Sequence, residues 1–204
     1  MCCLNKQSFC SFDVPSAYLR GKQRECERVV AIPPHGFQSC DERGVRMVWV
    51  MDSPLYGQTD AGAIWNRTFN DSMTASSKGA DDALERCQYD PCIYTREHEC
   101  GGHVTLPLYV DDGRLYYDQT CRAQATAIKQ KLHKEYAVEV GPEDPAEDYF
   151  LGANRYRDES GSVSLRGTSY IEQLVKRFAD GDLSKYPAAW SYTPADETLV
   201  RAHA

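Results

Sequence analysis

The sequence has no apolar run as long as the roughly 18 residues that a membrane-spanning helix needs. It has no excess of positive charge either, because 30 acidic side chains outnumber 23 basic ones and the formal net charge is −7. Surfaces that hold phosphates are normally basic, so this balance argues against a protein that binds nucleic acid mainly by charge. Part of the acidity lies in residues 139–148, which we expect to form a solvated segment. Internal repeats and low-complexity tracts are absent too, which excludes a repeat architecture.

The sequence also lacks the features of a secreted protein. The first residues, Met1 to Lys6, do not lead into the apolar run of a secretion signal, so we expect an intracellular protein, cytoplasmic or nuclear, without a membrane partner. The nine cysteines form no disulfide-scaffold spacing and are odd in number, so free thiols are expected. The run from Cys87 to His103 contains thiolate and imidazole ligands that suit zinc, but extended strands there would spread them apart. We therefore favour free cysteines over a zinc site.

The composition that is present is that of one globular domain. With 204 residues, 42% hydrophobic and 26% charged, the chain is long enough to bury a core. Runs rich in β-forming residues, separated by turn residues, predict strands over residues 9–14, 29–32, 45–51, 91–96, 104–110, 114–117, 149–156 and 162–165. Residues 60–74, 120–136 and 168–179 are predicted helices, the first two with Asp60 and Thr120 as N-caps. The pattern predicts an α+β fold, an antiparallel sheet with helices packed on one face and inserted hairpins.

The predicted helix over residues 120–136 has two distinct faces. Its core-facing residues are expected to include Ala123, Ala127, Ile128 and Leu132. The opposite face carries Arg122, Lys129, Lys131 and Lys134. This basic stripe is either a surface for a phosphate backbone or an ordinary solvated helix face, and charge patterning favours the second.

The most informative segment is the apolar run of residues 104–110, which ends in Asp111 and Asp112. Gly113 follows, and Asp-Gly after an apolar run predicts a tight hairpin turn, because glycine tolerates the positive φ that such turns need. A second predicted strand upstream could lie beside this hairpin and present Asp13. Three carboxylates there could hold two metal ions that clamp the attacking and leaving oxygens of a phosphoryl transfer. Taken alone, an acidic pair at a hairpin is usually a solvated turn.

The order of motifs along the chain adds a family resemblance. The stretch from Phe12 to Gly21 resembles the first catalytic motif of the copia-type retrotransposon reverse transcriptases, which reads Asp-Val-x-x-Ala-Phe-Leu-x-Gly. Further segments follow in that family's order: Pro33 to Phe37, Ser53 to Gly57 with Trp65 behind it, Asp90 to Tyr94, Tyr109 to Asp112, Tyr149 to Gly152, and Tyr170 to Phe178. Coincidence is a poor explanation for so many ordered landmarks over most of the chain.

The resemblance implies a polymerase palm and its reaction. Residues 1–178 would be a reverse transcriptase palm with partial fingers, and residues 179–204 an irregular tail at the start of a truncated thumb. The implied activity is RNA-directed DNA synthesis, in which deoxynucleoside triphosphates (dNTPs) are added to a primer 3′-hydroxyl by two-metal nucleotidyl transfer. The implied partners are an RNA or DNA template with its primer, dNTPs, and other parts of the Pol polyprotein.

The resemblance also implies the metal ligands. Asp13 and Asp111 would be the principal ligands, with Asp112 beside them and less directly engaged. The backbone carbonyl of Val14 would be a further ligand. Such oxygen ligands suit two Mg²⁺ ions, with Mn²⁺ as a substitute.

The nucleotide would lie against the segment that follows the first motif. The resemblance implies that backbone N–H groups of Ser16 and Ala17 meet the triphosphate, as amides converging in a turn attract anions. The Tyr18 ring would crowd a 2′-hydroxyl and so favour deoxynucleotides. Gln58 would help to seat template and nucleotide only if its loop shifts, because Asp60 stands where the family has glutamine. A carboxylate at that place would repel a triphosphate.

Departures from the family pattern leave other interpretations open. Asp60 is one departure, and Pro107 is another, since proline deletes a ladder hydrogen bond from what should be a central strand. Only twelve residues precede Asp13, so the basic fingers segment is expected to be missing, and whether this chain is an enzyme by itself stays open. The alternative is an inactive or co-opted retrotransposon relic that binds RNA or protein. A palm-fold nucleotidyl cyclase is a third interpretation, but it does not account for the ordered landmarks.

Overall fold

The computed structural model describes residues 7–75, 81–99, 101–158 and 162–178. The chain divides into two compact units, residues 1–145 and 146–204, and each contains its own antiparallel sheet. The tail predicted over residues 179–204 lies outside the described residues. In the part of the chain that is described, no helix is both long enough and apolar enough to cross a membrane.

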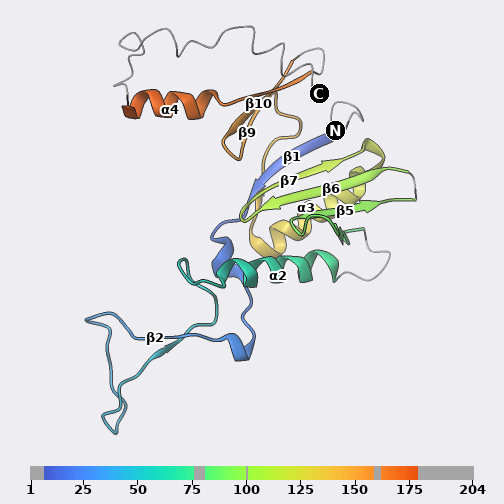
Figure 1. Ribbon diagram of the computed structural model, residues 1–204. Coiled ribbons are helices and arrows are strands. Elements are labelled where there is room, and N and C mark those ends of the chain that lie inside the picture. Colours follow the sequence, from blue (N-terminus) through green and yellow to red (C-terminus); the bar gives the residue numbers. More distant parts are fainter. Residues whose placement is uncertain (1–6, 76–80, 100, 159–161, 179–204) are drawn as a thin grey trace. The chain divides into compact units, whose positions relative to one another are not determined.

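A six-stranded antiparallel sheet is the centre of the first unit, with the strand order β4-β5-β6-β7-β1-β8 (Figure 1). The strands are β1 (Ser8–Asp13), β4 (Glu85–Arg86), β5 (Ile93–Glu97), β6 (His103–Tyr109), β7 (Asp112–Tyr117) and β8 (Glu139–Val140). Every second residue of β6, namely Val104, Leu106 and Leu108, is buried, because successive side chains of a strand point to opposite faces. One face of the sheet is therefore apolar and requires cover.

Two helices, α2 (Ala61–Thr74) and α3 (Arg122–Tyr136), supply the side chains that pack on this apolar face (Figure 1). Trp65 and Phe69 lie one turn apart on α2, and their ring centroids are 5.3 and 5.6 Å from that of Tyr136 on α3. Burying each such aromatic side chain contributes roughly 2–3 kcal/mol. The short 3-10 helices are η1 (Ala17–Arg20), η2 (Glu25–Glu27) and η3 (Gln119–Cys121). Helices on one face of an antiparallel sheet confirm the predicted α+β class.

The helix predicted over residues 120–136 begins later than predicted. Residues 119–121 form η3, and the α-helix starts at Arg122, so Thr120 is not its N-cap. The buried residues of α3 are Ala125, Ile128, Leu132 and Tyr136. Ala123, predicted to face the core, is exposed, because it lies off this stripe of three- and four-residue steps. Asp60 does directly precede α2, but its side chain makes no capping hydrogen bond.

The predicted Asp-Gly turn is displaced by two residues. Strands β6 and β7 pair Tyr109 with Asp112, so the loop between them is Val110-Asp111. Val110 has the positive φ of this loop, 58°, and Gly113 lies inside β7. A Cβ on Gly113 would lie 2.3 Å from Cζ of the buried Phe12 ring on β1. Glycine is needed here for the close approach of an aromatic ring, and the turn does not use it.

Pro107 lies in β6, a central strand, as the sequence suggested. The N–H of Leu108 donates to the carbonyl of Cys92 at 2.8 Å, toward β5, so the nitrogen of Pro107 faces β7. The pairing of β6 with β7 skips Leu106 and Pro107 and resumes at Leu108. The prediction that proline interrupts the ladder is confirmed, and the strand continues past the interruption.

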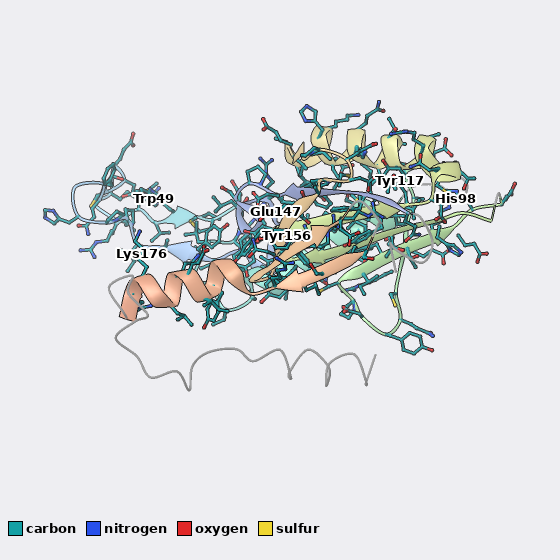
Figure 2. All side chains as sticks on the ribbon, turned by 90° about the horizontal axis from the view of Figure 1, so that it is seen from above. Trp49, His98, Tyr117, Glu147, Tyr156 and Lys176 are labelled. Carbon is teal, nitrogen blue, oxygen red and sulfur yellow. The ribbon has the colours of Figure 1, made fainter. Side chains whose placement is uncertain are left out.

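The runs predicted as strands over residues 29–32 and 45–51 do pair, but over fewer residues. The strands β2 (Val30–Ala31) and β3 (Trp49–Val50) form a two-stranded antiparallel sheet, and one further bridge joins Cys40 to Arg46. Large apolar side chains of this hairpin are exposed, among them Ile32, Phe37, Val45 and Trp49, the last of which is labelled in Figure 2. An exposed apolar surface of this kind indicates an interaction surface.

The second unit contains a three-stranded antiparallel sheet in the order β11-β10-β9 and the helix α4 (Thr168–Phe178). Its strands are β9 (Glu147–Phe150), β10 (Ala153–Arg157) and β11 (Val163–Arg166). The continuous strand predicted over residues 149–156 is wrong, because Leu151 and Gly152 form a two-residue loop there, with φ of 48° and 84°. Two positive φ values in such a loop indicate a type I′ turn, which glycine favours.

The acidic segment over residues 139–148, predicted to be solvated, is anchored along its first half. Strand β8 pairs with β1, and beyond it the N–H of Gly141 donates to the Ser11 carbonyl at 2.8 Å. Asp144 exchanges two hydrogen bonds with Phe9: its side chain accepts from the Phe9 N–H at 3.0 Å, and its own N–H donates to the Phe9 carbonyl at 2.9 Å. The segment therefore extends the edge of the sheet.

Glu143 ties this segment to α3. Its carboxylate accepts a hydrogen bond from Lys129 at 2.8 Å and pairs with Arg122. Lys129 lies with its Nζ 5.0 Å from the ring centroid of Tyr117, which Figure 2 labels. The hydrogen bond from Lys129 is the main cause that lowers the pKa of Glu143 from 4.5 to about 2. Charges on α3 thus stabilise the sheet edge.

We expect Glu143→Gln to lower the free energy of unfolding by about 1 kcal/mol at neutral pH, because the amide loses its pairing with partly exposed cations. Since the folded-state pKa is depressed, this stabilisation is complete above pH 4.5 and disappears as the pH falls toward about 2. Urea unfolding at a series of pH values measures the effect. The two proteins should differ at neutral pH and converge in acid, and a constant difference would contradict the assignment.

Candidate active site at the tip of strands β1 and β7

Strands β1 and β7 bring two of the three predicted carboxylates together. Asp13 ends β1 and pairs with Asp112 at the start of β7. Directly opposite residues of antiparallel strands point to the same face, so these two side chains are neighbours. That face is opposite to the one on which α2 and α3 pack, because Phe12 beside Asp13 belongs to the core. The structure thus places β1 beside the acidic hairpin, as the sequence predicted.

The third carboxylate, that of Asp111, belongs to the hairpin loop, and two hydrogen bonds hold this loop. The backbone N–H of Val14 donates to the Asp111 carbonyl at 2.8 Å. The indole Nε1–H of Trp65 donates to the Val110 carbonyl at 2.6 Å. A φ of 58° at the β-branched Val110 costs on the order of 1–3 kcal/mol. Contacts from two other segments therefore hold the loop in a strained conformation.

A further acid, Glu139, lies on the other side of Asp13. Strand β8 pairs Glu139 with Asp13, so Glu139, Asp13 and Asp112 form a row across three neighbouring strands. Like charges directly opposite one another on neighbouring strands repel. Arg114 offsets part of this charge, since its Nη1 lies 3.8 Å from Oδ1 of Asp112. Sequence reasoning missed Glu139 because no local pattern indicates that its segment pairs with β1.

The donor chemistry of this tip suits a hard divalent cation. Its acidic side chains offer only carboxylate oxygens, which are the ligands that Mg²⁺ prefers. A bound cation would also remove the repulsion along the row of acids. Among the described residues, no three His, Cys, Asp or Glu side chains form a group that could hold a metal ion. The assignment of Mg²⁺ ions to this tip, which the family resemblance implies, therefore depends on its carboxylate ligands and on the pairing of Asp13 with Asp112.

The segment expected to meet a nucleotide follows β1 directly. Ser16 precedes η1 with a left-handed φ of 56°, and its carbonyl accepts the N–H of Leu19 at 2.9 Å. The first N–H groups of a helix have no acceptor within that helix. The amides of Ser16, Ala17 and Tyr18 are therefore not used within η1 and could donate to an anion, although the Ala17 side chain is buried.

Tyr18 is half-buried and packs on Tyr56. Their ring centroids are 5.0 Å apart, with the planes tilted by 41°. Gly62, in the first turn of α2, also faces Tyr18, because a Cβ built there would lie 3.8 Å from the Tyr18 hydroxyl. Tyr18 thus packs on Tyr56 and lies close to the first turn of α2, whereas the sequence placed Tyr56 only within a family landmark.

Gln58 and Asp60 have local surroundings. The side-chain oxygen of Gln58 accepts the N–H of Leu55 at 3.3 Å, and its carbonyl accepts that of Ala61 at 3.2 Å. Its side-chain nitrogen is buried and has no hydrogen-bond acceptor among the described residues. Asp60 is exposed at the N-terminus of α2. In this conformation both oxygens of Gln58 accept hydrogen bonds from backbone N–H groups within three residues of it.

The basic stripe of α3 has acidic partners within the first unit. Arg122 and Lys129 pair with Glu143, and Lys131 lies 3.3 Å from Asp82. Three of the four cations of the stripe therefore form intramolecular ion pairs, which favours an ordinary helix face over a phosphate-binding surface.

Six cysteines of the described residues, Cys10, Cys26, Cys40, Cys87, Cys92 and Cys121, are free thiols, as predicted. Cys10 and Cys121 are buried, and burial raises the pKa of the Cys10 thiol. Cys100, which belonged to the zinc interpretation, lies outside the described residues.

A groove of about 1030 Å³ lies elsewhere in the first unit, between residues 19–24, α2 and the end of α3. None of the predicted site residues lines it. Asp13 is exposed and Asp111 and Asp112 are half-buried, and all three acids lie outside this groove.

Fold and site together define the class of this protein: an α+β domain whose central hairpin carries one acid in its loop and the next at the start of β7, beside a strand that ends in a third acid. Sequence comparison identifies the family. The chain belongs to the reverse transcriptase (RNA-dependent DNA polymerase) family, which matches residues 2–189. The resemblance to copia-type reverse transcriptases is thereby confirmed.

The chain is also similar to the transposon Ty5-1 protein YCL074W of Saccharomyces cerevisiae, with 26% identity over 164 residues. The match covers 80% of this chain and 48% of the yeast protein. The chain therefore spans about half the length of the curated relative that it matches.

Proposed function

We propose that this chain is the palm, with part of the fingers, of a retrotransposon RNA-directed DNA polymerase that adds deoxynucleotides to a primer 3′-hydroxyl. The pairing of Asp13 with Asp112, joined to the hairpin loop by the bond from Val14 to Asp111, carries the proposal. Family membership supports the same reaction. Phosphoryl transfer needs mainly positioning and charge stabilisation from the protein, and converging carboxylates suit that task.

Asp13 and Asp111 would hold two Mg²⁺ ions, with the Val14 carbonyl as a further ligand and Mn²⁺ as a substitute. When bound, the ions would lower the pKa of the primer hydroxyl and stabilise the leaving oxygen of pyrophosphate. Asp112 would be less directly engaged, because Arg114 lies 3.8 Å from it and already offsets its charge.

The residues after β1 would bind the nucleotide. Ser16 and Ala17 would present backbone N–H groups to the triphosphate. Tyr18 would exclude the 2′-hydroxyl of a ribonucleotide. The Tyr18 ring lies against Tyr56, so it cannot shift toward Tyr56 to make room for that hydroxyl. Gln58 would seat template and nucleotide only after its bond to the Leu55 amide is broken.

The proposed partners are an RNA or DNA template with its primer, dNTPs, and other parts of the Pol polyprotein. Residues 1–178 would be the palm with partial fingers, and residues 179–204 the start of a thumb. The exposed apolar hairpin of β2 and β3 would be the fingers part, and its side chains would contact other segments of the complete polymerase.

Primer extension on an RNA template tests the proposal, using both this chain and the longest reading frame that contains it. We expect extension with dNTPs and Mg²⁺, its loss when EDTA removes the ion, and far weaker extension with ribonucleotides. Asp60 favours the alternative, because its exposed carboxylate stands where the family has glutamine and would repel a triphosphate. RNA or protein binding that is indifferent to Mg²⁺, without extension by either protein, would support an inactive or co-opted relic.

A further inference from the structure

Trp65 has no part in the proposed chemistry, yet it contacts the loop that contains Asp111. Its indole Nε1–H donates to the Val110 carbonyl at 2.6 Å, and its side chain is only 2% exposed. The ring packs on Phe69 and Tyr136, with centroid distances of 5.5 and 5.3 Å. A cluster of buried aromatic rings therefore fixes the position of the donor.

The acceptor belongs to a strained peptide. Val110 is β-branched and has a φ of 58°, a region that such residues rarely adopt. Both carbonyls of the two-residue loop accept hydrogen bonds from other segments: that of Val110 from Trp65, and that of Asp111 from Val14. A conformation of this kind persists only when its surroundings hold it. Without the bond from α2, the loop could relax toward a negative φ.

We infer that Trp65 is a positioning residue, whose indole N–H holds the Val110-Asp111 loop in the conformation that presents the Asp111 carboxylate. The catalytic consequence rests on the proposed function, whereas the structural consequence does not. The first turn of α2 lies beside Tyr18, which belongs to the proposed nucleotide-binding segment. The same helix holds the loop that contains Asp111, through the bond from Trp65 to Val110. Movement of α2 would therefore shift this loop and the nucleotide-binding segment together.

Trp65→Phe tests the inference, because it removes the indole N–H and keeps an aromatic ring in the cluster. Phe69→Leu is the matched control, since it disturbs the same cluster one turn along α2 and leaves the bond to Val110 in place. The first measurement is hydrogen exchange of the Val14 amide by NMR, because this amide bonds to the Asp111 carbonyl. We expect the Val14 amide to exchange roughly tenfold faster in Trp65→Phe, as for the loss of one hydrogen bond. In Phe69→Leu, compared at matched global stability, we expect its exchange rate to be unchanged.

The second measurement is primer extension. Trp65→Phe should lower kcat by roughly 10- to 100-fold, as expected when a reacting group is displaced by about 1 Å, with little change in KM for the dNTP. Phe69→Leu should keep kcat within a few-fold of the wild type. Wild-type Val14 exchange in Trp65→Phe, or equally fast exchange in both variants, would overturn the inference. Fast exchange in Trp65→Phe alone, in a protein that shows no extension at all, would uphold the positioning role and refute the proposed function.

Discussion

Asp111→Asn is expected to reduce primer extension by roughly 10³-fold or more, because a neutral amide cannot supply the charge that holds the ions on which the reaction depends. The fold should remain intact, since the bond from Val14 goes to the backbone carbonyl of Asp111 and does not involve its side chain. Single-turnover primer extension at saturating Mg²⁺ measures the loss, and urea unfolding checks the fold.

Asp112→Asn is the matched control, the same change one residue further along the chain. Asp112 begins β7 and has Arg114 3.8 Å away, so we expect a smaller loss, roughly 10- to 100-fold. Undiminished extension by Asp111→Asn would refute the role of Asp111. The reverse order of losses would show that Asp112 is the principal ligand.

Gly113→Ala is expected to destabilise the first unit by about 3 kcal/mol, as for the insertion of a methyl group into a filled core. The added Cβ would lie 2.3, 2.5 and 2.9 Å from three atoms of the Phe12 ring. Phe12 is 3% exposed and belongs to the hydrophobic core, so its ring has no free space to enter. Urea unfolding followed by circular dichroism measures the change.

The same substitution elsewhere supplies the control. Gly62→Ala places a Cβ on α2 at 3.8 Å from the Tyr18 hydroxyl, an ordinary contact, and should stabilise the helix by about 1 kcal/mol. Adding Phe12→Leu to Gly113→Ala should recover part of the loss, because the two changes affect one contact and are not additive. Equal stability of Gly113→Ala and the wild type would contradict the packing described for Gly113.

The strands and helices with a strong local pattern were predictable. The apolar run of residues 104–110 predicted β6, and the pattern that follows Asp60 predicted α2. Prediction failed where a short local structure intervened. The 3-10 turn η3 delays the start of α3, and the loop at Leu151-Gly152 divides the strand predicted over residues 149–156.

The candidate site was predictable in part. The acidic pair after an apolar run, and the upstream motif with Asp13, indicated which residues belong together. Glu139 was overlooked, because its pairing with Asp13 joins segments more than 100 residues apart without any local signal. The bond from Trp65 to Val110 was overlooked for the same reason, since it joins residues 45 positions apart.

The sequence by itself determined the family and the α+β class and indicated the candidate acids, because motif order and hydrophobic periodicity are properties of local runs of residues. The tertiary structure alone decided which residues turn the hairpin, which acids face one another, and what holds the loop. Val110, rather than Gly113, has the positive φ, because the register of β6 against β7 and the donors Trp65 and Val14 impose it. Register and packing depend on the simultaneous fit of distant segments, which no single run of residues encodes.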